Sequence, residues 1–188
     1  MKKIGVLGGT FDPPHLGHLI IAETVRTELR LDEVWFMPTN EPPHKNKANS
    51  TGKDRLKMVE LAIEDNEHFK MNDIEMKRLG KSFTFDTMSI LVNEHPDYGF
   101  YFIIGADMVD YLPHWSRIDE LVHLVKFVGV QREGYRLESS YPVIKVDIPM
   151  IDISSTMIRK QLAAHTSVKY LIPDPVYAYI KENQLYEN

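Results

Sequence analysis

The sequence of 188 residues contains no cysteine. Disulfides, thiolate zinc sites and thiol nucleophiles are therefore excluded by composition alone. Long apolar runs are also missing: the run after the basic start, residues 4–7, ends at Gly8 and is too short for the core of a signal peptide. No other stretch approaches the length of a membrane span. We therefore expect a cytoplasmic protein with no membrane partner.

A basic excess is missing too, since 22 lysines and arginines stand against 27 acidic residues, for a net charge of -5. Nucleic-acid-binding surfaces usually carry clustered basic residues, so we expect no nucleic-acid partner. An anionic ligand must then be bound by local groups. The length and the 43% hydrophobic content suit a single domain over residues 1–188. They leave a homo-oligomer open.

The order of apolar patterns predicts the fold. Short β-rich runs recur at residues 4–7, 34–37, 100–104, 127–130 and 143–148. Stretches with apolar residues at helical spacing separate or flank them, at residues 19–31, 55–63, 85–92 and 118–125. Two further helices are expected after Ser154 and after Pro173. This alternation predicts an α/β fold with a single Rossmann-like, doubly wound parallel sheet.

The first candidate site is the segment from Gly8 to His18. A strand that runs into Gly8 and Gly9 brings bare backbone to the carboxyl end of the sheet, where its amides can approach a phosphate closely. The next helix is expected to start near Leu16, with its N-terminal dipole facing the same crevice. His15 and His18 are three residues apart and can present both imidazoles on one face. Two imidazole donors beside free helix amides suit a phosphoryl group that gains charge in transit.

Each of these residues has a simpler interpretation when it is taken alone. A single histidine here could be a capping or surface residue, and two glycines could form a tight turn. A zinc site would need a third ligand at helical spacing, as in H-E-x-x-H, which the sequence lacks. The motifs G-x-G-x-x-G and G-x-x-x-x-G-K-[ST] are missing as well, which disfavours a dinucleotide-binding dehydrogenase and a P-loop NTPase.

A second candidate site lies at residues 153–159. Ser154 and Ser155 offer hydroxyls at a helix start, and Arg159 follows one turn later, a set that favours a phosphate chain. Taken alone, the same residues could be a well-capped helix with its arginine in solvent.

Both segments resemble known signatures. The run Gly-Gly-Thr-Phe-Asp-Pro-Pro-His followed by Gly-His resembles the H-x-G-H nucleotidyltransferase signature, in the longer form of bacterial nicotinate-nucleotide adenylyltransferases. Residues 153–159 resemble that family's I-S-S-T-x-I-R segment. The resemblance implies catalysis by two histidines and contacts to ATP by ten other residues. The histidines are His15 and His18, and the ATP contacts are Gly8, Gly9, Thr10, Phe11, Gly17, Gly105, Asp107, Ser154, Ser155 and Arg159.

The acceptor side is predicted from further patches. Local positive charge around Pro42-Pro43-His44-Lys45, with Lys47, Lys53 and Arg55 close behind, favours an anionic ligand. Residues 82–87 are similar to the family's S-Y-T-x-D-T segment, with Phe83 in place of its usual tyrosine. The family's tryptophan stacks on a pyridine ring. The implied acceptor-binding residues are His44, Lys45, Thr84, Trp115 and Arg132.

The resemblance implies adenylyl transfer from ATP to nicotinate mononucleotide, giving deamido-NAD and pyrophosphate. Mg²⁺ is expected as cofactor, held mainly by ATP oxygens and water, with no metal site formed by the protein itself. A pantetheine-phosphate adenylyltransferase would share the ATP half, and a nucleotide-sensing module with a degenerate site is the alternative outside enzymes. The intact motif residues argue against degeneration. An aminoacyl-tRNA synthetase is disfavoured because the sequence lacks K-M-S-K-S.

Overall fold

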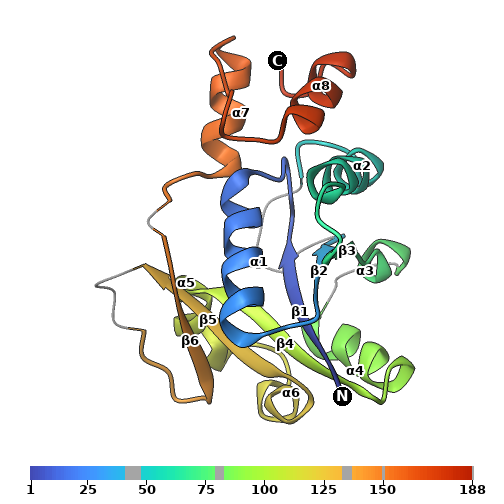
Figure 1. The fold of residues 1–188 in the computed structure, drawn as a ribbon, viewed down its shortest axis with the longest axis vertical. Coiled ribbons are helices and arrows are strands. Elements are labelled where there is room, and N and C mark those ends of the chain that lie inside the picture. The colour runs from blue at the N-terminus through green and yellow to red at the C-terminus, as the bar shows by residue number, and fades with distance from the viewer. Residues whose placement is uncertain (41–47, 79–82, 133–136, 150, 188) are drawn as a thin grey trace.

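Six parallel strands form one sheet in the order β3-β2-β1-β4-β5-β6 (Figure 1). The computed structural model describes residues 1–40, 48–78, 83–132, 137–149 and 151–187. The strands are β1 (Lys2–Gly9), β2 (Glu33–Pro38), β3 (Phe69–Met71), β4 (Tyr98–Gly105), β5 (Lys126–Arg132) and β6 (Val143–Ile148). From β1, the strands β2 and β3 are added on one side of the sheet, and β4, β5 and β6 on the other. The point between β1 and β4, where the strand order reverses, is where doubly wound sheets bind ligands. The predicted fold class is confirmed.

Both faces of the sheet are covered by helices, so its central strands are apolar on both sides. Along β4, Tyr101 and Ile103 belong to one buried cluster, while Phe100, Phe102 and Ile104 belong to the other. This alternation follows from the two-residue repeat of a strand. The first cluster packs under α1 (Leu16–Leu29), α2 (Gly52–Ile63), α7 (Ser155–Ala163) and α8 (Asp174–Glu182). The second packs under α4 (Thr84–Glu94), α5 (Ala106–Tyr111) and α6 (Ile118–Leu124).

The sequence patterns did not predict the short elements. These are β3, with three residues, α3 (Ile74–Lys77), α5 and the 3₁₀ turn at residues 112–114. Segments of three to six residues complete too few repeats to show a strand or helix period. The first long helix begins at Leu16, as predicted. It ends at Leu29 rather than residue 31 because Arg30 takes a left-handed conformation with φ of 51°.

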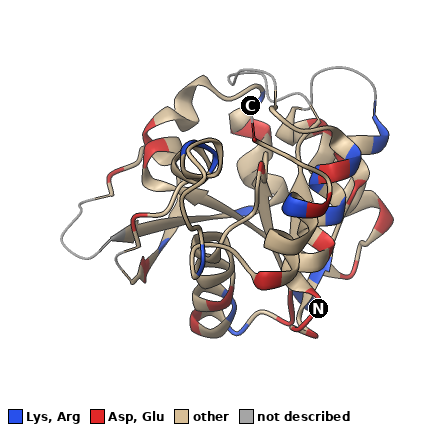
Figure 2. Ribbon diagram, turned by 90° about the horizontal axis from the view of Figure 1, so that it is seen from above, with Lys and Arg blue, Asp and Glu red and all other residues tan. Residues whose placement is uncertain are grey.

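Charged residues of both signs are spread over the helices (Figure 2). Acidic and basic residues occur side by side on several helices, and the acidic ones are slightly more numerous in the sequence. Among the described residues, no helix combines the length and the apolar character that crossing a membrane requires.

Candidate active site

The ends of β1 and β4 bring the predicted glycines to one edge of the sheet. The strands are parallel neighbours with Leu7 opposite Ile103, so Gly8, Gly9 and Gly105 lie at the same carboxyl edge. Beside them is a cleft of about 410 Å³. Four predicted residues line this cleft, namely His15, Gly17, Gly105 and Asp107.

Much of the remaining cleft wall is apolar and was not predicted. It is formed by Ile21, Val130, Ile148, Ile151 and Ile153, together with Ala106 and the polar Gln131. An apolar slot of this kind suits a flat aromatic base, while the polar groups at its end suit the sugar and phosphates. A signal was present in the sequence, because two isoleucines alternate with Asp152 directly before the predicted phosphate motif.

The two histidines lie against each other at the start of α1. Their rings stack with centres 3.7 Å apart and an angle of 24° between the planes, which confirms the predicted shared face. The backbone N–H of His15 donates to Nδ1 of His18 at 3.1 Å. Because Nδ1 of His18 accepts, the proton of its neutral ring resides on Nε2. Nε2 of His18 is therefore a hydrogen-bond donor of defined position.

Gly17 makes room for the His15 ring. A Cβ at position 17 would lie 2.9 Å from Nδ1 and 3.0 Å from Cε1 of His15, closer than real side-chain contacts. The glycine in this motif is thus required by the close approach of an imidazole. His15 is 7% exposed, and its Nδ1 is buried with no hydrogen-bond partner among the described residues.

The expectation of free amides at the start of α1 needs correction. The N–H of Leu16 donates to the carbonyl of Leu171 at 2.9 Å, and that of His18 donates to the carbonyl of His15 at 3.0 Å. The amide of His18 is thus hydrogen-bonded within the first turn of α1, and the amide of Leu16 is hydrogen-bonded to the segment before α8. These two amides are therefore not free to donate to a phosphate.

The loop of residues 8–18, which we call the histidine loop, is bonded to the second motif. Ser155 Oγ donates to the carbonyl of Pro13 at 2.8 Å, and Arg159 Nη1 donates to the carbonyl of Asp12 at 2.7 Å. Ser154 is the N-cap of α7, with its Oγ accepting from the N–H of Met157. The two segments that resemble family signatures are therefore in direct contact, although 142 and 147 residues separate the bonded pairs.

Phe11 supports the histidine loop from below. Its side chain is 2% exposed, packs edge-on against the His18 ring at 4.9 Å and lies where a Cβ on Gly9 would be 3.0 to 3.3 Å away. A contact between Phe11 and ATP, if formed, is thus left to its backbone. Gly8 has ordinary space, with the Phe102 ring 3.5 Å from the position of its absent Cβ. Thr10 lies beside these residues and is half-buried.

Contrary to the prediction from the sequence, Arg55 does not belong to an exposed cluster of positive charge on the acceptor side. It is 3% exposed, and its Nη1 donates to the carbonyls of Thr10 at 3.0 Å and Thr39 at 2.6 Å. The guanidinium of Arg55 is thus hydrogen-bonded to backbone carbonyls beneath the histidine loop. Buried arginines take such partners because an unpaired charge in the interior is costly. The predicted acceptor residues His44 and Lys45 lie outside the described residues, as does Lys47.

Thr84 and Trp115 lie on the side of the sheet covered by α4 to α6, outside the lining of the cleft. Thr84 is the first residue of α4. Trp115 packs edge-on against Phe102 at 5.9 Å, and its Nε1 has no partner among the described residues. Arg117 stacks on the Phe85 ring at 3.6 Å, which brings the chain after Trp115 to the first turn of α4. Arg132 ends β5, as predicted.

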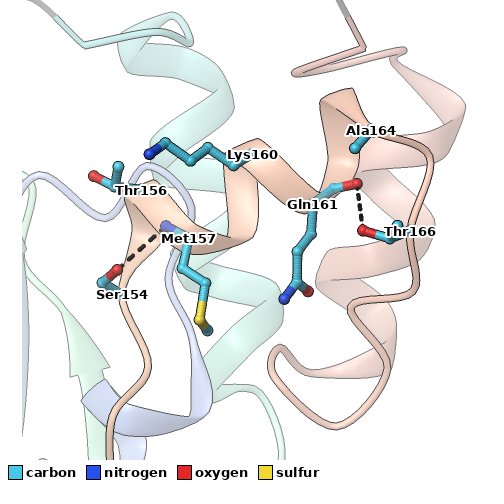
Figure 3. A pocket seen from close by; sticks show the side chains of 7 residues that line it. All are labelled: Ser154, Thr156, Met157, Lys160, Gln161, Ala164 and Thr166. Carbon is cyan, nitrogen blue, oxygen red and sulfur yellow. Dashed lines mark hydrogen bonds between the residues drawn. The ribbon is translucent and has the colours of Figure 1, made fainter.

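A second hollow, also of about 410 Å³, follows the outer face of α7 (Figure 3). Its lining comprises Ser154, Thr156, Met157, Lys160, Gln161, Ala164 and Thr166. Ser154 belongs both to this hollow and to the predicted phosphate motif, and Lys160 projects from the same helix. This hollow thus presents the hydroxyls of Ser154, Thr156 and Thr166 and a single lysine.

Residues 6–161 match the family model described as cytidylyltransferase-like. The chain is 49% identical to nicotinate-nucleotide adenylyltransferase from Bacillus subtilis, with 100% of both chains covered. It is 54% identical to a probable nicotinate-nucleotide adenylyltransferase from Oceanobacillus iheyensis over 186 residues, 99% of this chain and 97% of the relative. The chain belongs to the nicotinate-nucleotide adenylyltransferase family. This confirms the resemblance that the two motifs indicated.

A solved nicotinic acid mononucleotide adenylyltransferase from Plasmodium falciparum, complexed with NaAD, has the same fold as this member of the nicotinate-nucleotide adenylyltransferase family. The TM-score is 0.84 at 22% identity, and the match covers 100% of this chain and 98% of that chain. At this identity the likeness establishes the fold alone.

Burial lowers the pKa of the His15 imidazole from 6.5 to about 4, so in this nicotinate-nucleotide adenylyltransferase family member the ring is neutral at pH 7. Between pH 6.5 and 4, His15 is protonated in the unfolded chain but stays neutral in the folded chain. The contribution of His15 to the free energy of unfolding is therefore expected to fall by about 3 kcal/mol as the pH drops through this window and then to level off.

Two measurements check this expectation for His15. An NMR titration of its imidazole should give a midpoint near 4, and the extra loss of stability toward acid should vanish in His15→Gln. A midpoint near the ordinary value of 6.5 would contradict the burial of this ring.

Proposed function

We propose that this chain transfers the adenylyl group of ATP to nicotinate mononucleotide, giving deamido-NAD and pyrophosphate. The observation that carries the proposal is the pair of stacked histidines at the start of α1, beside the apolar cleft and bonded through the histidine loop to Ser155 and Arg159. The cleft suits the adenine base, and the triphosphate would extend out of the cleft past the two histidines. The curated relatives, named for this activity, support the same reaction.

The reaction needs no protein base. A phosphate oxygen of nicotinate mononucleotide, ionised at neutral pH, attacks the α phosphorus of ATP in line. The new P–O bond forms as the bond from the α phosphorus to the oxygen bridging to the β phosphate breaks, and pyrophosphate leaves. Catalysis then consists of positioning and of stabilising charge on the phosphoryl oxygens. We assign that stabilisation to Nε2–H of His18 and to the neutral imidazole of His15.

Mg²⁺ is proposed to enter with ATP. It would neutralise the triphosphate, with ATP oxygens and water as its main ligands. Among the described residues, no three or more histidine, aspartate or glutamate side chains are grouped so as to hold a metal ion. The protein's own contribution at the phosphates would be the hydroxyl of Ser154 and the remaining N–H groups of Arg159, because the predicted Ser155 hydroxyl already donates to the Pro13 carbonyl.

A preference for nicotinate mononucleotide over nicotinamide mononucleotide is expected from α4. Its N-cap, Phe83, offers no side-chain acceptor to the first amides of the helix, and Thr84 adds a hydroxyl there. A helix N-terminus favours a carboxylate over a neutral amide by about 1 kcal/mol, so we expect about a fivefold ratio in kcat/KM.

Pyrophosphate release in the presence of ATP and each mononucleotide measures this ratio. Phosphopantetheine serves as a third acceptor, to test the pantetheine-phosphate alternative. Equal rates with the two mononucleotides would refute the preference for the acid. If none of the three acceptors led to pyrophosphate release, adenylyl transfer would be refuted.

A further inference from the structure

The end of the chain reaches the histidine loop. Tyr186, 174 residues beyond Asp12, places its hydroxyl 2.5 Å from Asp12 Oδ1. Figure 1 shows α7, α8 and the C-terminus at the same end of the molecule as the loop that follows β1. Tyr186 is half-buried and packs against the first core cluster, so this contact belongs to the folded body of the protein.

The carboxylate of Asp12 is 3% exposed and is surrounded by donors. Besides Tyr186, it accepts from Ser50 Oγ at 2.5 Å, from the N–H of Asn49 at 2.6 Å and from Asn49 Nδ2 at 3.3 Å. Burial alone would raise the pKa of this carboxyl, but these hydrogen bonds hold it below its usual value. Asp12 is therefore an anion in the interior, and each donor compensates part of its lost hydration.

Asp12 sits at the centre of the histidine loop, three residues before His15. The loop is bonded at several carbonyls, with Thr39 N–H donating to Gly9, Arg55 to Thr10, Arg159 to Asp12 and Ser155 to Pro13. These contacts fix its backbone from α2, α7 and the end of β2. The carboxylate adds an anchor from a side chain of the loop itself to residues 49, 50 and 186.

We propose that Tyr186 is a positioning residue for adenylyl transfer, whose hydroxyl holds the Asp12 carboxylate and thereby the placement of His15 and His18. This role rests on the function proposed above. The hydroxyl suits it, because burial and the neighbouring Asp12 raise the pKa of Tyr186, which keeps the hydroxyl protonated and able to donate. Loss of the hydroxyl leaves a buried anion with one donor fewer, and the loop can shift to restore hydration.

Tyr186→Phe tests the proposal, and Tyr179→Phe is its matched control. Tyr179 lies in α8 and donates to Asp54 Oδ1 of α2 at 2.8 Å, so it too holds a carboxylate, but one that does not belong to the histidine loop. We expect kcat to fall at least about tenfold in Tyr186→Phe, with KM for both substrates within about twofold, since misplacement of donors by fractions of an ångström acts on the transition state. In Tyr179→Phe we expect kcat to stay unchanged.

Two further readouts separate positioning from a general loss of structure. The NMR signals of the His15 and His18 imidazoles should shift in Tyr186→Phe and not in Tyr179→Phe. In the background of Asp12→Asn, Tyr186→Phe should add less than about twofold, because both changes break one contact. A normal kcat with unshifted imidazole signals, or full additivity with Asp12→Asn, would overturn the proposal. The imidazole signals remain informative even if the proposed reaction fails, which keeps the two failures distinguishable.

Discussion

Replacing His18 with alanine is expected to lower kcat for adenylyl transfer by about 10²- to 10³-fold, the usual effect of removing one preorganised donor from a developing charge. Nε2–H of His18 is fixed as a donor because Nδ1 accepts from the backbone of His15. In the proposed complex, Mg²⁺ and other groups share the charge of ATP in its ground state, so the loss falls on the transition state. The Kd of ATP should change by less than about threefold.

Single-turnover rates and ATP titrations of His18→Ala measure both quantities. His123→Ala is the control, because His123 is an exposed residue of α6 on the other side of the sheet. Unchanged turnover in His18→Ala would remove His18 from the mechanism. A large loss of ATP affinity with unchanged kcat would instead assign it to ground-state binding.

Gly17→Ala is expected to separate activity from stability. Alanine inside a helix is favoured over glycine by about 1 kcal/mol, so the melting temperature should hold or rise. The new Cβ would meet the His15 ring at 2.9 Å, however, and the imidazole must move. Since His15 stacks on His18, both donors are displaced, and we expect kcat to fall by about 10²-fold.

Gly99→Ala is the matched control for this substitution. Gly99 lies in β4 at the far end of the strand from the cleft, and a Cβ there would meet the Met1 side chain at 3.3 Å. Its activity should equal that of the unmodified protein. An active Gly17→Ala variant would mean that the His15 ring can move without cost to the reaction. An unfolded one would mean that its first helical turn is less tolerant than the packing around Gly17 indicates.

Much of the fold and half of the site could be predicted because the information is local. The alternation of apolar runs indicated five of the strands, and the contiguous motif around His15 and His18 places both imidazoles on one helical turn. Ser155 and Arg159 were predicted as ligands of phosphate, but their bonds to the histidine loop follow from the way the folded chain brings α7 beside that loop. No pattern along the chain encodes that contact.

The residues that sequence reasoning missed depend on distant partners. Asp12 is a conventional turn residue until Ser50 and Tyr186 surround its carboxylate. Arg55 resembles a surface charge until folding buries it under the carbonyls of Thr10 and Thr39. The predicted roles of Thr84, Trp115 and Arg132 toward an acceptor stay predictions, as do those of His44 and Lys45.

The position of β1 in the middle of the sheet has a consequence for the order in which the protein is made. A nascent chain can pair β1 with β2 once Pro38 has emerged, but β1 meets its other neighbour, β4, only when synthesis has reached Gly105. The cleft takes its lining from residues as late as Ile153. During translation the two histidines are thus made well before the cleft is complete, because its lining requires Ile153.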